Sequence, residues 1–114
     1  MLKKNCRLDF ECGEDELTVF INGEIDHYCA VWVRGEIDEK IAKHRPKKLV
    51  LVLSGIDFMD SSGIGLVMGR YARMQSIGGK LAVKNPSERV ERILRLAGIE
   101  RIVNIEKGEA EDEK

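Results

Sequence analysis

Residues 48–53 read KLVLVL, a short continuous apolar run that begins just after Pro46. Such a run is typical of a strand that is buried on both faces of a sheet. Residues 54–65 read SGIDFMDSSGIG, which we interpret as a loop that leads into a helix over residues 61–77. The apolar residues of this helix recur at a spacing of three or four, as expected for one buried face: Ile64, Val67, Tyr71 and Met74. The sequence therefore predicts a strand–loop–helix unit at the centre of the fold.

Upstream of this unit, the pattern predicts a hairpin and then a helix. Apolar and polar residues alternate over residues 6–12 and again over residues 17–21, and Asn22-Gly23 is read as the end of the second strand. A helix is expected over residues 28–44, with Asp26 as its N-cap or first-turn acid. Its apolar face is formed by Ala30, Val33, Ile37 and Ile41.

Downstream, residues 80–83 predict another strand and residues 85–88 (NPSE) open a third helix, with Asn85 as the N-cap. Ile102-Val103 is expected to add a last short strand. A hairpin followed by alternating strands and helices predicts an α/β fold. We expect one mixed β-sheet with helices packed mainly on one of its faces.

Composition limits the function. The chain has 114 residues, enough for one domain, with 43% hydrophobic and 34% charged residues. Its net charge of −1 argues against nucleic-acid or polybasic membrane binding, since both require a positive field. We see neither a signal peptide nor an apolar run long enough to span a bilayer, which favours a cytoplasmic location. The domain is expected over residues 1–105, and residues 106–114 form an acidic tail that we expect to be flexible.

The three cysteines form no C-x-x-C pair. We expect Cys6 and Cys12 to pack as small apolar side chains in the first strand. Free cysteines are also consistent with the expected cytoplasmic location.

The segment with the strongest functional signal is residues 57–65 (DFMDSSGIG), where a strand meets a helix. Asp60 or Ser61 is placed to cap the helix, as at many helix starts. Gly63 and Gly65 weaken a helix by about 1 kcal/mol each relative to alanine, which suggests that something approaches closely here.

Two classes of enzyme, serine hydrolases and nucleotide-binding enzymes, are alternatives for this segment. A serine hydrolase needs a histidine beside the nucleophile, and the spacing places neither His27 nor His44 there. The glycines at 63, 65 and 69 do not form a dinucleotide or P-loop motif. A regulatory role is also compatible with the residues: a phosphate on Ser61 would lie at a helix N-terminus, which tolerates it, and would repel an acidic or closely packed partner.

Residues 57–65, together with 23–27 (GEIDH), resemble the bacterial anti-sigma factor antagonists of the STAS domain class, and more closely their sporulation member, which controls the first forespore sigma factor. The similarity covers nearly the whole chain, including 69–71, 77–79 and 96–99. It implies a single STAS domain that acts as a binding protein, with no catalytic, cofactor or metal residue of its own.

The resemblance also implies a mechanism. The unphosphorylated protein would bind a homodimeric anti-sigma factor that is also a serine kinase, and so free the sigma factor. ATP and magnesium would lie on that kinase, which phosphorylates Ser61 and ends the complex, and a serine phosphatase would reset the protein. The partner-binding residues that we expect are Asp26, His27, Asp57, Met59, Asp60, Ser61, Ser62, Gly63 and Ile64. A STAS protein of another partner-switching pathway, such as a stress response or a sensory assembly, is the alternative, and a small hydrolase or nucleotide-binding enzyme is a further one.

Overall fold

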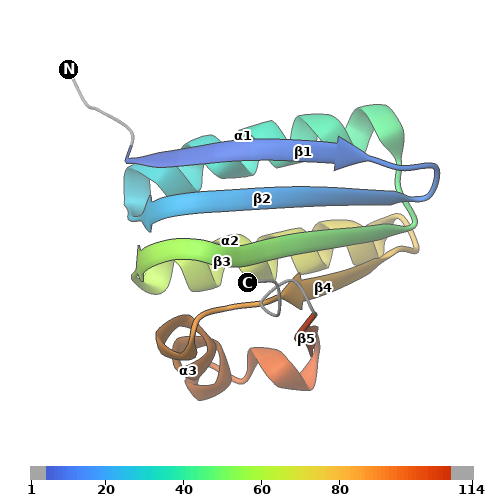
Figure 1. Ribbon diagram of the computed structural model, residues 1–114. Helices are drawn as coiled ribbons and strands as arrows, with labels where there is room; N and C mark the ends of the chain where they lie inside the picture. Colours follow the sequence, from blue (N-terminus) through green and yellow to red (C-terminus); the bar gives the residue numbers. More distant parts are fainter. Residues whose placement is uncertain (1–4, 109–114) are drawn as a thin grey trace.

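The computed structural model describes residues 5–108, which form one five-stranded sheet and three α-helices. The strands are β1 (Cys6–Cys12), β2 (Glu16–Ile25), β3 (Lys48–Met59), β4 (Lys80–Lys84) and β5 (Asn104–Glu106), and they lie side by side in chain order (Figure 1). The helices are α1 (His27–His44), α2 (Ser61–Ser76) and α3 (Glu88–Leu96), and a short 3-10 helix covers Ile99–Arg101. The predicted α/β fold with a mixed sheet is confirmed, because β1 is antiparallel to β2 and all later neighbours are parallel.

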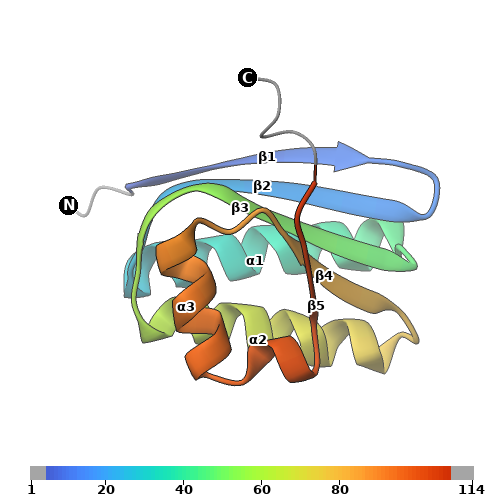
Figure 2. The ribbon, with the colours of Figure 1, turned by 60° about the horizontal axis from the view of Figure 1, so that its bottom comes forward.

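The three helices share one face of the sheet. Each of the three crossovers between parallel strands moves one place in the same direction, and right-handed crossovers then put every helix on the same side. Figure 2 shows α1 and α2 side by side under the sheet, and α3 near the β4–β5 edge. Their apolar residues enter a single core, in which Val33, Val67 and Leu94 are at most 1% exposed. The predicted packing on one face is therefore correct.

Two strands are longer than the sequence pattern predicted. β3 continues through residues 54–59, so Asp57 and Phe58 belong to a strand and not to a loop. β2 continues past Asn22-Gly23 to Ile25, with breaks in its register against β3 on both sides of this pair. Gly23 has a φ of +105°, and an added Cβ would lie 2.9 Å from the Cα of Cys6. The glycine therefore serves an irregularity inside the strand, and does not end it.

Two boundaries near the C-terminus also differ from the prediction. Ser87, and not Asn85, caps α3, since its hydroxyl accepts a hydrogen bond from Val90 N at 3.2 Å. The last strand is β5 and not Ile102-Val103. It includes Glu106, so the predicted domain boundary at residue 105 falls inside a strand. Most of the predicted acidic tail, residues 109–114, lies outside the described residues.

The prediction that Cys6 and Cys12 pack as free apolar side chains is correct only in the burial of Cys6. Cys6 forms a disulfide with Cys29, which ties the start of β1 to the first turn of α1. Cys12 is exposed, with its Sγ 3.6 Å from His44 Nε2. Periodicity placed Cys6 correctly on the buried face, but it cannot show that the chain brings Cys29 to the same place. Among the described helices, none is both long and apolar enough to span a membrane.

Candidate functional site

The two segments singled out in the sequence meet at one edge of the sheet. β2 and β3 are parallel, with Ile25 paired to Met59 at their carboxyl ends. Just beyond this pair, Asp60 N donates a hydrogen bond to Ile25 O at 3.3 Å. The starts of α1 and α2 are therefore neighbours, and Asp26 and Asp60 lie at adjacent strand–helix junctions.

Both aspartates are helix caps, as predicted for Asp26. Asp26 Oδ1 accepts a hydrogen bond from Cys29 N at 3.0 Å, and Asp60 Oδ1 accepts one from Ser62 N at 2.8 Å. Both side chains are half-buried. A cap of this kind contributes about 1 kcal/mol, so each carboxylate has a structural function whether or not it also meets a partner.

Three of the predicted site residues are exposed: His27, Asp57 and Ser61. Ser61 is the first residue of α2, and within residues 5–108 no group is hydrogen bonded to its hydroxyl. His27 is the first residue of α1, and its ring packs edge-on against Tyr28 at 5.6 Å between ring centres. Within the same described range, no hydrogen bond joins His27 to a serine, as a nucleophile–base pair would require.

Two predicted contact residues, Met59 and Gly63, are buried, while Ser62 and Ile64 are half-buried. An added Cβ on Gly63 would overlap the Met59 side chain, which explains the glycine by packing inside the domain. Gly65 is different, because an added Cβ there meets nothing within 4 Å. The group that approaches Gly63 closely is thus a side chain of the same domain, whereas internal packing does not explain Gly65.

A groove of about 240 Å³ runs between the first two turns of α1 and the first two turns of α2. Its lining residues are His27, Ala30, Val31, Arg34, Ser62, Gly65 and Leu66. Asp57 does not line this groove. It borders a separate depression with Arg7 and Glu24 from the hairpin. The structure thus brings His27 and Ser62 into one groove and places Asp57 beside it on another surface.

Several exposed residues near the junctions were not predicted as site residues. Tyr28 is 55% exposed and Phe58 is 45% exposed, and both are large apolar side chains. Val31 and Arg34 follow His27 by four and seven residues, which places them on the same helix face. That spacing is the signal that could have identified them in the sequence.

An ion pair connects α1 and α2 further from the junctions. Arg70 is only 5% exposed, its Nη2 donates to Asp38 Oδ2 at 3.2 Å, and its Nε lies 2.9 Å from Oδ1 without forming an aligned hydrogen bond. Burial lowers the pKa of the Arg70 guanidinium, an effect that Asp38 opposes and that the positive charges of Arg34 and Arg73 reinforce. Asp38 thus pairs with Arg70 alone among the described residues, while Arg34 and Arg73 act on Arg70 only through their charge.

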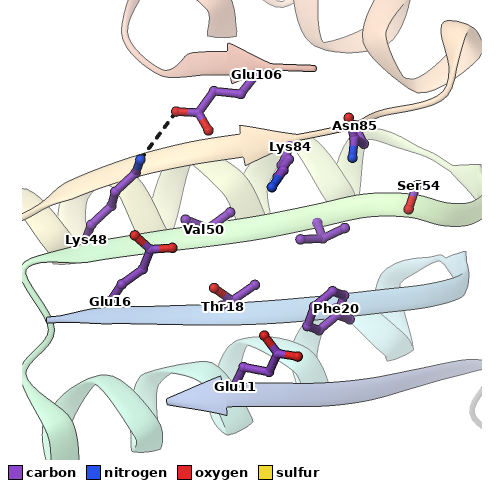
Figure 3. A pocket seen from close by; sticks show the side chains of 11 residues that line it. Glu11, Glu16, Thr18, Phe20, Lys48, Val50, Ser54, Lys84, Asn85 and Glu106 are labelled. Carbon is purple, nitrogen blue, oxygen red and sulfur yellow. Dashed lines mark hydrogen bonds and ion pairs between the residues drawn. The ribbon is translucent and has the colours of Figure 1, made fainter. Parts of the chain in front are cut away.

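A third hollow, of about 360 Å³, lies on the sheet face opposite the helices (Figure 3). Its floor includes Phe20 and Val50, and Lys48 Nζ lies 3.3 Å from Glu106 Oε2 across it. Carboxylates and lysines both surround this hollow, so its charge favours neither a cationic nor an anionic ligand. Among the described residues, no group of three histidine, cysteine, aspartate or glutamate side chains is placed to hold a metal ion.

Comparison with known proteins identifies the class. The STAS domain family matches residues 7–111, and this chain belongs to that family. It is 36% identical over 101 residues to the anti-sigma F factor antagonist of Paenibacillus polymyxa, covering 89% of this chain and 86% of that protein. It is 32% identical over 103 residues to the anti-sigma-B factor antagonist of Bacillus subtilis, covering 89% and 91%.

The fold comparison agrees. The solved structure of the anti-sigma factor antagonist SpoIIAA in its unphosphorylated form superposes with a TM-score of 0.80 at 24% identity, over 93% of this chain and 91% of that one. This similarity shows that the two chains share a fold. The STAS family expected from residues 57–65 and 23–27 is thereby confirmed.

Proposed function

We propose that this chain is an anti-sigma factor antagonist that binds an anti-sigma factor and is switched off by phosphorylation of Ser61. Two relatives of similar length, at 36% and 32% identity, carry the name of anti-sigma factor antagonist. The fold shared with SpoIIAA is consistent with the same class of activity.

The observation that carries the proposal is the position of Ser61. It is exposed at the first position of α2, beside the junction that holds Asp26. Its hydroxyl has no hydrogen bond to lose within residues 5–108, so modification costs the domain no internal contact. The cap of α2 comes from Asp60, so it does not depend on the serine hydroxyl.

The physical effect of the phosphate follows from its charge. A phosphoserine carries about −1.5 to −2 charges near neutral pH. At Ser61 it would add to the charges of Asp26 and Asp60, which cap the two adjacent helix starts. A partner docked closely there would be repelled by this charge and by the bulk of the group, while the helix start tolerates an anion. The switch therefore needs little rearrangement inside the domain.

In this proposal the partner supplies the chemistry. The anti-sigma factor is a homodimeric serine kinase that holds ATP and magnesium, and a separate serine phosphatase restores the free hydroxyl. This chain contributes the acceptor serine and no catalytic residue, and it acts in the cytoplasm.

The first test is the modification itself. Intact mass and phosphopeptide mapping of the protein from its own host should give one phosphate, on Ser61. Protein that carries no phosphate under any growth condition would contradict the switch.

The second test is binding to each of the host's anti-sigma factors that has a kinase domain. Ser61→Asp should abolish binding and leave the thermal midpoint nearly unchanged. Ser54→Asp is the matched control, because Ser54 is also exposed but lies on the opposite sheet face. If Ser61→Asp binds as tightly as the wild type, the switch mechanism is wrong.

A second candidate is an antagonist in a stress-response pathway. The observation that favours it is the B. subtilis relative, which is named for sigma-B and covers the chain as fully as the sigma F relative does. The same binding panel separates the two, since it shows which anti-sigma factor the protein captures.

A further inference from the structure

The groove between α1 and α2 carries positive charge. Its lining includes one arginine, Arg34, and no acidic residue. Arg34 is exposed and forms no ion pair within residues 5–108. Beyond Arg34 the same helix pair holds Arg70 and Arg73, and Asp38 there is already engaged by Arg70. The groove therefore presents one cationic side chain, Arg34, with which no carboxylate among residues 5–108 is paired.

The walls of the groove are apolar. Val31 is 46% exposed, and Leu66 and Ala30 form deeper parts at 5% and 8%. Gly65 presents no side chain, and an added Cβ there would stand in open space. The exposed side chain of Met68, at 43%, lies less than one helical turn beyond Gly65 on α2. A cation between exposed apolar walls matches an amino-acid side chain better than it matches a hydrated inorganic anion.

The groove is also continuous with the proposed switch. Ser62 lines it and directly follows Ser61, and His27 lines it from the junction capped by Asp26. An occupant of the groove would therefore lie beside the phosphorylation site.

We propose that this groove receives an acidic side chain of the anti-sigma factor, with the carboxylate paired to Arg34 and the aliphatic part of the side chain against Val31 and Leu66. The geometry suits this pair, because a guanidinium presents a planar pair of N–H donors to a carboxylate. The inference rests on the proposed function and adds to it a named contact and the charge of the partner segment.

The test uses the full chain and the anti-sigma kinase that binds the wild type, with the dissociation constant as the readout. Arg34→Glu should weaken binding about 50-fold, because it replaces a charge-assisted hydrogen bond by repulsion. Arg34→Lys retains the charge but loses the planar pair of donors, so it should weaken binding by less than Arg34→Glu does. Arg92→Glu is the control, since Arg92 is also an exposed arginine but lies on α3, and it should change binding less than about 2-fold.

A second pair of variants separates charge from shape. Val31→Glu and Val31→Lys place side chains of similar bulk at the mouth of the groove, with opposite charge. A groove that receives a carboxylate tolerates the lysine at least about 10-fold better than the glutamate. The thermal midpoints of all variants should match the wild type within a few degrees, because neither Arg34 nor Val31 is buried.

The outcomes are distinct. If Arg34→Glu binds like the wild type, or if Val31→Lys weakens binding as much as Val31→Glu, the groove proposal is overturned while the proposed function stands. If the wild type binds none of the host's anti-sigma kinases, the proposed function fails and the groove proposal falls with it.

Discussion

Gly63 of α2 packs directly against Met59 of β3. A Cβ added to Gly63 would lie 2.7 Å from Met59 Sδ and 2.9 Å from Cε, and closer still to Cγ. Met59 is itself 4% exposed and pairs with Ile25 at the edge of the sheet. The contact thus fixes how close the first turn of α2, which begins at Ser61, approaches the strand ends.

Gly63→Ala should lower the free energy of unfolding by about 1–2 kcal/mol, because the buried Met59 has to move to admit the methyl group. Gly65→Ala is the matched variant two residues away, in open space, and should raise the free energy by up to about 1 kcal/mol through helix propensity. Urea unfolding measures both. Equal effects at the two positions would show that the Met59 contact does not matter.

Asp38→Ala should destabilise the domain by about 3 kcal/mol, because it leaves the guanidinium of Arg70 buried without its carboxylate. The double variant Asp38→Leu/Arg70→Met should recover much of this loss, since it removes both charges and keeps the volume. Thermal and urea unfolding of the wild type, Asp38→Ala and the double variant measure these differences in stability. A double variant no more stable than Asp38→Ala would contradict the assignment of the loss to an unpaired charge.

Cys6→Ser should cost about 3 kcal/mol of stability under oxidising conditions, since it opens a disulfide that spans 23 positions of the chain. Cys29→Ser should cost a similar amount, and reduction of the wild type should reproduce both. Cys12→Ser is the control, because Cys12 is exposed and outside the bridge. A thiol titration that finds three free cysteines in the oxidised protein would refute the pairing.

The pH dependence of Glu91 has a defined sign. Hydrogen bonds from Lys107 and Arg95 hold the pKa of the Glu91 carboxyl below its ordinary value of 4.5. A pKa that is lower in the folded state stabilises the protein above the unfolded pKa, and this stability is lost as pH falls through the folded value. Glu91→Gln should therefore lower the urea midpoint near pH 7, and this effect should shrink as the pH falls below the ordinary pKa of 4.5. If the difference in urea midpoint between Glu91→Gln and the wild type grew on acidification, the sign assigned to the Glu91 pKa shift would be wrong.

Asp57→Asn should change the partner affinity and leave the stability nearly unaltered. Asp57 is exposed, and within residues 5–108 it forms no ion pair or side-chain hydrogen bond, so its removal costs the fold little. Asp60→Asn keeps an acceptor for the cap and serves as the comparison. Titration calorimetry against the captured anti-sigma factor measures the effect. Unchanged affinity for Asp57→Asn would remove this residue from the proposed interface.

The order of the main elements followed from sequence because each of them buries a periodic set of apolar residues. The spacing of Val33, Ile37 and Ile41 gave α1, and the apolar run at 48–53 gave the core of β3. The ends of the strands were harder to predict from the sequence. Phe58 looks like part of a polar loop, and only the ladder with β2 makes it a strand residue.

The sequence alone determined the α/β pattern, the cap at Asp26 and the segment that begins α2, because helix periodicity and caps depend on residues within a few positions of one another. The tertiary structure decided what that segment faces. It buried Met59 and Gly63 against each other, separated Asp57 from His27, and joined Cys6 to Cys29. It also formed the groove that contains Arg34. Contacts between residues far apart in the chain depend on how the sheet and the helices pack, and local sequence patterns do not predict that packing.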